Sequence, residues 1–378
     1  ALSSVIPCYA AGQMQKLQVL RVVACNGMKE VFETQLGTSS NKNNKSGGDE
    51  GNGGIPRVKN NVIMLPNIKI LKIRYCNHLE HIFTFSALES LRQLEELMIE
   101  DCKAMKVIVK KEEDASSKKV VVFPRLTSIV LVKLPELEGF FLGMNEFRWP
   151  SFDEVTIKNC PKMMVFAAGG STAPQLNYIH TGLGKHTLDQ SGLNFHQTTS
   201  PSSHGATSCP ATSEGTIWSF HNMIELYVER NYDVKKIIPS SELLQLQKLE
   251  KVHVCSCDGV DEVFEALEAA GRNRNRNRNS SSGSAFDESS QTTTLFNLPN
   301  LTQVKWEYLC GLRYIWKNNL RYIWKNNQWT AFEFPNLTRV HISTCKRLEH
   351  VFTSSMGGSL LQLQELCIWN CSEMEEVI

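Results

Sequence analysis

Apolar and polar residues recur in one fixed frame along most of the chain. IKILKIRYCNHLEHIF, which begins at Ile68, aligns without gaps with LEELMIEDCKAMKVIV from Leu94 and LTRVHISTCKRLEHVF from Leu337. The shared frame is L-x-x-L-x-I-x-x-C-x-x-L-x-x-V-F, and its positions are numbered below as offsets from the first residue. Frames start near residues 17, 68, 94, 126, 152, 223, 249, 301, 337 and 363. These ten copies predict an array of stacked repeats over residues 1–378.

Offsets +3 and +5 are apolar and mostly alternate with polar neighbours, as at Leu71 and Ile73. This spacing is typical of a short strand with one buried face. Offsets +11 and +14 are apolar again, as at Leu79 and Ile82, and carry the chain back across the core. One repeat cannot bury its apolar face alone, so the repeats must stack. The predicted fold is an irregular, curved α/β solenoid with a parallel sheet on its concave face.

Cysteine occupies offset +8 in seven of the ten copies, which are Cys25, Cys76, Cys102, Cys160, Cys257, Cys345 and Cys371. The other three copies have Leu134, Asn231 and Leu309 there. A cysteine tied to one repeat position is better read as a small buried hydrophobe than as half of a disulfide. The chain has 12 cysteines, and this pattern indicates reduced thiols and a reducing compartment.

Four polar segments interrupt the array. They bury too little apolar surface to offset the entropy lost on ordering, so we expect mobile loops there. These insertions are residues 34–62, 110–119, 167–216 and 266–294, the last of which contains RNRNRNRN. The octapeptide LRYIWKNN occurs in tandem at 312–319 and 320–327. Because only one copy fits the frame, the second is expected to bulge out.

Leu-rich stretches that begin at Ser86, Ser240 and Ser354 precede three of the repeats. Serine is a favoured N-cap residue. We therefore predict short helical turns at these places, capped by serine, on the convex side.

Composition excludes several classes of protein. The net charge is +1 over 378 residues, so no bulk attraction to nucleic acid or to an anionic membrane is expected. No window approaches the roughly 18 apolar residues of a membrane helix. The sequence starts without Met and stops at Ile378 in mid-frame. It is therefore expected to be a fragment of a longer protein.

Motifs that carry chemistry are weak. Gly182–Thr187 resembles the end of a phosphate-binding loop, but Ile179 stands where the first glycine is needed and His186 follows Lys185. His253, Cys255 and Cys257 lack a second ligand pair at zinc-site spacing nearby in the sequence. No nucleophile, base and orienting group come together. We predict no catalytic residues, no metal and no cofactor for this chain.

The frame resembles the leucine-rich-repeat consensus L-x-x-L-x-L-x-x-N/C-x-L. Together with FPNLT and LPNI before the strands and LEHIF, LEHVF and EEVI after them, it resembles the C-terminal repeats of plant coiled-coil nucleotide-binding leucine-rich-repeat disease-resistance proteins. It is most similar to the lettuce resistance-gene-candidate family. The resemblance implies an intracellular immune receptor whose ATP- or ADP-binding domain lies outside this fragment. The resemblance also implies two kinds of partner: a pathogen effector or guarded host protein, and the nucleotide-binding domain of the same receptor, which is absent from this fragment.

Offsets +2, +4, +6 and +7 point from the predicted sheet to solvent and vary in chemistry between copies. We predict a mosaic protein-binding surface on the concave face, with exposed Tyr and Trp as anchors. Its candidate residues are Lys72, Arg74, Tyr75, Glu96, Met98, Glu100, Asp101, Glu225, Tyr227, Glu229, Arg230, Lys305, Glu307, Tyr308, Arg339, His341, Glu365 and Trp369. Three alternatives stay open: the substrate-recognition repeats of a ubiquitin-ligase adaptor, an extracellular receptor and a structural scaffold. Sequons such as Asn300 and Asn336 keep the extracellular alternative alive.

Overall fold

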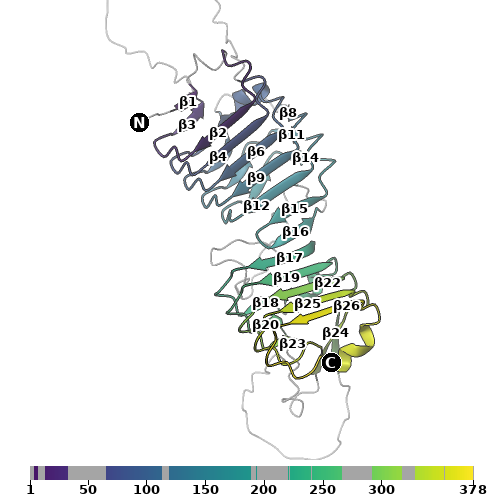
Figure 1. Ribbon diagram of the computed structural model, residues 1–378. Coiled ribbons are helices and arrows are strands. Elements are labelled where there is room, and N and C mark those ends of the chain that lie inside the picture. Colours follow the sequence, from purple (N-terminus) through teal and green to yellow (C-terminus); the bar gives the residue numbers. More distant parts are fainter. Residues whose placement is uncertain are drawn as a thin grey trace, which may run out of the picture. The chain divides into compact units, whose positions relative to one another are not determined.

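Short parallel strands, one for each copy of the frame, are the main elements of the computed structural model (Figure 1). Each covers offsets +2 to +6, except that β17 already begins at offset 0. They are β2 (Val19–Val23), β4 (Ile70–Arg74), β6 (Glu96–Glu100), β9 (Ser128–Val132), β12 (Glu154–Lys158), β17 (Met223–Glu229), β19 (Lys251–Cys255), β22 (Gln303–Glu307), β25 (Arg339–Ser343) and β26 (Glu365–Trp369). The structure describes residues 4–6, 13–32, 65–112, 119–188, 193, 220, 222–239, 241–265, 292–316, 328–352 and 354–377.

The frame phase sets which side of each strand is buried. In β4 and β6, the register pairs Leu71 with Leu97 and Ile73 with Ile99, and all four side chains are at most 1 % exposed. The residues between them face solvent at least in part. Because equal offsets pair across neighbouring strands, apolar side chains form continuous columns. The predicted parallel sheet of a repeat solenoid is confirmed.

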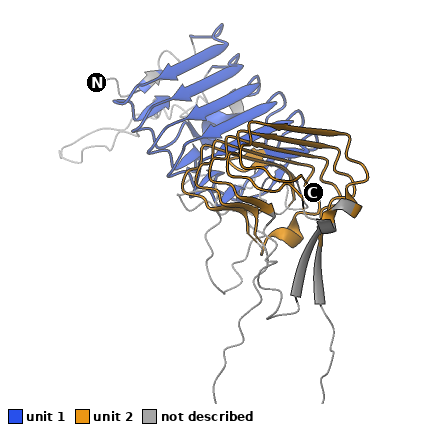
Figure 2. Cartoon of the chain, turned by 60° about the horizontal axis from the view of Figure 1, so that its bottom comes forward, with its two compact units in different colours: residues 1–179, 188–200 blue, residues 180–187, 201–378 orange. Residues whose placement is uncertain are grey.

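The chain divides into two compact units (Figure 2). The first unit comprises residues 1–179 and 188–200, and the second comprises 180–187 and 201–378. The main strands of the first unit follow the order β2-β4-β6-β9-β12-β15, where β15 is Tyr178–Thr181 and crosses the division. In the second unit the order is β16-β17-β19-β22-β25-β26. Strand β16 (Gly184–Thr187) pairs with β17 antiparallel, so the sheet is not parallel throughout.

Two further sets of strands were not predicted from the sequence pattern. One set lies near offsets +13 to +15 (β3, β5, β7, β10, β13, β18, β20 and β23), and the other ends four residues before the start of a frame (β8, β11, β14, β21 and β24). In the first unit, β5, β7, β10 and β13 form one parallel sheet and β8, β11 and β14 another, while β1 pairs with β3; in the second unit β18, β20 and β23 form a sheet, and β21 pairs with β24. Their bounds are β1 (Ser4–Ile6), β3 (Glu30–Phe32), β5 (Phe83–Thr84), β7 (Val107–Lys110), β8 (Val120–Val122), β10 (Gly139–Phe141), β11 (Glu146–Arg148), β13 (Val165–Ala167), β14 (Ser171–Thr172), β18 (Lys236–Ile238), β20 (Glu262–Phe264), β21 (Thr292–Asn297), β23 (Tyr314–Trp316) and β24 (Gln328–Glu333).

Helical structure in the described residues consists of short 3-10 helices, namely η1 (Phe85–Ser90), η3 (Leu243–Gln245) and η5 (Ser354–Ser359). Turns were predicted at these places. Their capping prediction was wrong for two of them, because the N-cap residues are Thr84 and Glu242 and neither side chain makes a capping hydrogen bond. No described helix has the length and apolar character needed to cross a membrane.

Aromatic packing fills the core of the first unit. Phe123 stacks on Trp149 with ring centroids 4.8 Å apart, and Phe140 meets Trp149 edge-on at 5.3 Å. Phe147 adds a further stacked contact with Trp149 at 5.4 Å. These rings are at most 2 % exposed. In the second unit, Trp306 is fully buried and lies opposite Val254 in the strand register.

Part of the predicted insertion 167–216 is folded. Leu176, Ile179 and Leu183 are buried, and β14, β15 and β16 lie in this segment. Leu176 thus begins a further strand-forming copy that the sequence pattern did not reveal, because Thr181, Gly184 and Thr187 occupy its core offsets +5, +8 and +11. Residues 194–216 and the insertion regions 34–62, 113–118 and 266–291 lie outside the described residues, as does the second LRYIWKNN copy.

Candidate protein-binding surface

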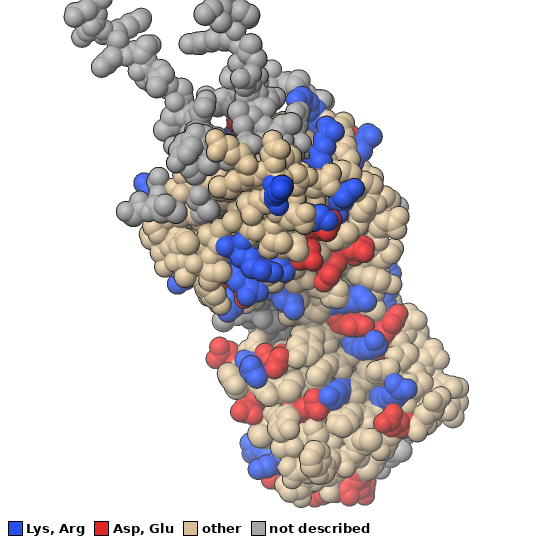
Figure 3. All heavy atoms as spheres, turned by 45° about the horizontal axis from the view of Figure 1, so that its top comes forward, with Lys and Arg blue, Asp and Glu red and all other residues tan. Residues whose placement is uncertain are grey.

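The outward face of the main strands consists of the residues at offsets +2, +4 and +6. Most candidates from the sequence analysis lie on it, each at least partly exposed: Lys72, Arg74, Glu96, Met98, Glu100, Glu225, Tyr227, Glu229, Lys305, Glu307, Arg339, His341, Glu365 and Trp369. Acidic and basic side chains are interspersed on the visible face of each unit (Figure 3). The term strand face is used below for these offsets.

The residues at offset +7 do not lie where the sequence predicted. Tyr75, Asp101, Arg230 and Tyr308 lie after the strands, in the turn that leaves them, and not on the strand face. This residue has a left-handed backbone in all ten copies, for example with φ of 57° at Tyr75 and 54° at Tyr308. The predicted aromatic anchors at this offset therefore form a rim along one edge of the sheet.

The left-handed turn fixes the hydrogen bonds of the residue at offset +7 and of the cysteine at offset +8. The N–H of Tyr75 still donates to the Glu100 carbonyl of the next strand at 3.0 Å. The Cys76 thiol turns inward and donates to the Arg74 carbonyl at 3.4 Å. All seven cysteines at offset +8 make this bond to the carbonyl two residues earlier. A small side chain with a weak donor fits this position, which explains the recurrence of cysteine.

The surroundings of these thiols shift the pKa in both directions. A hydrogen bond with the Cys102 thiol lowers the pKa of Cys76 to about 7. Burial raises the pKa of Cys160, in the first unit, and of Cys345, in the second, to about 12 each. The pKa of Cys102 is also raised, by a hydrogen bond with the Cys76 thiol and by burial. Cys76, Cys102 and Cys345 are buried and unbridged, whereas Cys371 is only half-buried. A raised pKa removes the thiolate that alkylating agents and oxidants need.

Charges on the strand face of the first unit pair between neighbouring strands. Lys72 Nζ lies 3.1 Å from a carboxylate oxygen of Glu96, and Arg74 Nε lies 3.0 Å from one of Glu100. A second guanidinium nitrogen of Arg74 contacts Met98 Sδ at 3.3 Å. On β4 and β6, the charge pattern predicted from sequence is therefore a set of matched pairs.

Strands β17 and β19 of the second unit carry a polar and aromatic patch. Lys251 pairs with Glu225 at 3.0 Å, and Tyr227 Oη donates to Glu229 at 2.7 Å. That hydrogen bond raises the pKa of Tyr227 to about 12. The Tyr227 ring also packs edge-on against His253, with centroids 5.0 Å apart. Tyr227 is thereby held in place and remains 42 % exposed.

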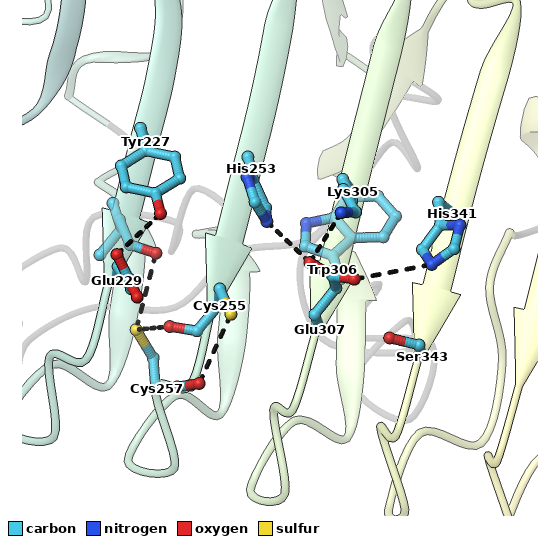
Figure 4. A network of polar contacts seen from close by, with 12 residues as sticks. Tyr227, Glu229, His253, Cys255, Cys257, Lys305, Trp306, Glu307, His341 and Ser343 are labelled. Carbon is cyan, nitrogen blue, oxygen red and sulfur yellow. Dashed lines mark hydrogen bonds and ion pairs between the residues drawn. The ribbon is translucent and has the colours of Figure 1, made fainter.

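Glu307 on β22 receives three basic side chains (Figure 4). Its carboxylate lies 3.0 Å from His253 Nε2, 2.9 Å from Lys305 Nζ and 3.7 Å from His341 Nε2. Burial raises the pKa of Glu307, but hydrogen bonds from Lys305 and His253 outweigh that effect and leave the pKa lowered. Glu307 is therefore ionised at neutral pH and joins three adjacent strands.

Two residues that belong to this arrangement were not among the predicted site residues. His253 and Cys255 occupy offsets +4 and +6 of β19, and their side chains face the Glu307 carboxylate closely enough to form a three-residue cluster. Their offsets were a usable signal. The sequence could not show that Glu307, 54 residues after His253, lies beside them. Arg339 and Glu365 form a weaker exposed pair at 3.5 Å on β25 and β26.

The segment that resembles the end of a phosphate-binding loop has a different structure. Gly184–Thr187 is strand β16 and not the start of a helix. Gly184 has φ of +143° and lies against the Glu225 carbonyl, where a Cβ would be 1.9 Å from the oxygen. His186 is buried and 2.9 Å from Thr181 Oγ1. The glycine therefore serves close packing of two strands, and the segment does not have the strand-to-helix geometry that binds phosphate.

Stacked parallel strands in repeat register, with a cysteine after most of the strands and a varied outward face, define a leucine-rich-repeat domain. The chain matches the family described as plant disease resistance protein RPS2-like, leucine-rich repeats, over residues 55–174, 208–311 and 312–372. These segments span most of the 378 residues, and the chain belongs to this family. No curated protein and no solved structure matches the chain.

Proposed function

We propose that the strand face, with its rim of offset +7 side chains, is the protein-recognition surface of an intracellular plant immune receptor. Its partners are a pathogen effector or a guarded host protein, and within the receptor the nucleotide-binding domain. The receptor is of the coiled-coil class and is similar to the lettuce resistance-gene candidates. Membership of the plant disease-resistance family supports a role in plant immunity. The ubiquitin-ligase adaptor and extracellular alternatives have no such support.

One observation carries the proposal. The outward offsets differ in chemistry from strand to strand, while the inward offsets hold the strands in one register. Side chains fixed on paired strands lose little ordering entropy when a partner binds. Exposed aromatic groups at the edge, such as Tyr75 at 44 % and Tyr308 at 51 %, are the residue types that dominate protein interfaces.

The first test is an exchange of two paired residues in the full-length receptor. In Arg74→Glu/Glu100→Arg the ion pair is kept with its polarity reversed, so the domain stays folded while the pattern facing a partner changes. We expect loss of partner binding and of the cell-death response, with unchanged protein level. Like-charge contact with the original partner is the reason.

The second test removes an aromatic group without changing the turn. Asn tolerates a left-handed backbone better than most residues, and Asn159 and Asn370 occupy the same offset in other copies. Tyr75→Asn should therefore preserve folding and weaken recognition by about tenfold or more, in the range of an interface hot spot. Asn159→Ser, at the same offset elsewhere, is the matched control. Recognition that survives both the charge exchange and Tyr75→Asn would overturn the proposal.

A further inference from the structure

The cluster formed by His253, Cys255 and Glu307 brings together an imidazole nitrogen, a thiol sulfur and a carboxylate oxygen. These three ligand atoms all lie within 4.8 Å of one another. His253 and Cys255 come from one strand at offsets +4 and +6, so both side chains point to the same face. Glu307 is directly opposite Cys255 on the neighbouring strand. The strand register therefore holds the set together.

These donors suit a particular class of ion. Imidazole, thiolate and carboxylate groups are the ligands that Zn²⁺ uses, at about 2.0–2.3 Å. In a tetrahedral site, two such donors are separated by roughly 3.3–3.7 Å. The pair His253 Nε2 and Glu307 Oε2 is at 3.0 Å. The other separations are at most 4.8 Å, so the ligand atoms must come closer together by no more than about 1 Å when an ion binds. Hard ions such as Mg²⁺ prefer oxygen ligands only.

The surroundings also favour an ion at this place. Tyr227 packs against the His253 ring and restricts its orientation. The side chain of Glu307 is 17 % exposed, so its charge is partly shielded from water. His341 Nε2 lies 3.7 Å from the other carboxylate oxygen, Oε1. Lys305 is the competitor: its ammonium, 2.9 Å from Oε2, must leave when a dication arrives. Its side chain is 44 % exposed, so solvent is open to it.

We propose that His253, Cys255 and Glu307 bind a divalent first-row transition-metal ion, of which Zn²⁺ is the representative, with the fourth position open to solvent on the strand face. The thiol of Cys255 loses its proton to solvent when the metal–sulfur bond forms, and the proton that His253 Nε2 donates to Glu307 moves to Nδ1 or to solvent. This inference concerns the cluster alone and does not depend on which protein the strand face recognises.

The experiment uses the whole 378-residue chain and Co²⁺ as a spectroscopic probe, followed by competition with Zn²⁺. We expect one ion per chain and a thiolate-to-cobalt charge-transfer absorption that Zn²⁺ abolishes. Cys255→Ser should remove that absorption, and Glu307→Gln should weaken binding by at least the roughly 10- to 100-fold seen for lesser changes around metal sites. Cys367→Ser is the matched control, because Cys367 is a more exposed thiol on the strand face, outside the cluster.

A measurement without variants keeps the inference testable if a variant misfolds. In the wild-type chain, Zn²⁺ should slow alkylation of Cys255 at least about tenfold while Cys367 reacts at an unchanged rate, as read by peptide mass spectrometry. Equal alkylation of Cys255 with and without Zn²⁺ would overturn the site. So would a cobalt absorption that is lost in Cys367→Ser and kept in Cys255→Ser.

Discussion

The two units use one frame inward and different chemistry outward. In the first unit, charges on β4 and β6 pair one to one, as with Arg74 and Glu100. In the second unit, three basic groups converge on the single carboxylate of Glu307. Both sheets nevertheless bury offsets +3 and +5 in the same register. The comparison teaches that packing constrains only one side of each strand, which leaves the other side free to differ.

The largest expected effect is the loss of stability when a buried residue of a main strand is replaced. Leu97 and Ile342 are 1 % and 0 % exposed in the first and second unit. Replacing either by Asp buries an unpaired charge and should destabilise its unit by more than about 4 kcal/mol. Hydrogen exchange read by mass spectrometry should show unfolding of the affected unit. Met98→Asp, on the outward side next to Leu97, is the control, and an equal effect there would contradict the burial pattern.

The next effect concerns the buried thiols, one in each unit. The pKa of Cys160 and of Cys345 rises to about 12 from an ordinary value of 9.0. Folding therefore favours the protonated thiol, and its stabilising contribution is complete below pH 9 and decreases as pH rises towards 12. The free energy of unfolding should fall by about 1.4 kcal/mol per pH unit for each thiol. Chemical denaturation at several alkaline pH values measures this slope.

Cys160→Ala and Cys345→Ala are the controls for that slope, since the Lys and Tyr groups that titrate in the same range remain in both. Each variant should lose pH dependence relative to the wild type in its own unit. An unchanged slope in both variants would mean that these thiols are accessible to solvent.

A smaller expected effect is the difference in stability cost between removing the Glu307 carboxylate in the second unit and removing the Glu100 carboxylate in the first. Glu307→Gln removes a carboxylate that holds two hydrogen bonds from basic groups and should cost about 1–2 kcal/mol. Glu100→Gln removes one surface pair and should cost less than about 1 kcal/mol. Because the pKa of Glu307 is lowered, its contribution should be present above pH 4.5 and lost as pH falls below it. Thermal unfolding at pH 7 and pH 3 measures the stability of both variants. Equal losses of stability in Glu307→Gln and Glu100→Gln would contradict the stronger pairing of Glu307.

The smallest expected effect is the change in the free energy of unfolding when Arg74 and Glu100 are exchanged. Since the pair is preserved, the free energy of unfolding should change by less than about 0.5 kcal/mol, while either single change places like charges opposite each other and costs up to about 1 kcal/mol. A double-mutant cycle by denaturant unfolding measures the coupling. Absence of coupling would show that the pair does not form in solution.

The sequence by itself determined the repeat frame, the buried offsets and the positions of the ten main strands, but not the further strands outside the main sheet. These features are local, because the alternation at Leu71 and Ile73 identifies a buried strand face without knowledge of its neighbours. It also indicated reduced cysteines from their fixed phase. It did not predict the left-handed turn at offset +7, because none of the ten residues there is glycine. Nor did it predict β15, whose copy of the frame is incomplete.

Only the tertiary structure decided which outward side chains meet. His253, Glu307 and His341 come from three different repeats separated by insertions of unequal length, so their spacing along the chain carries no contact information. Stacking in register puts Lys305 opposite both His253 and His341 and puts Glu307 two residues further along the same strand, so the Glu307 side chain reaches both histidines diagonally. The physical reason is that burial acts on each repeat separately, whereas charge pairing and metal ligation require atoms from several repeats within a few ångströms.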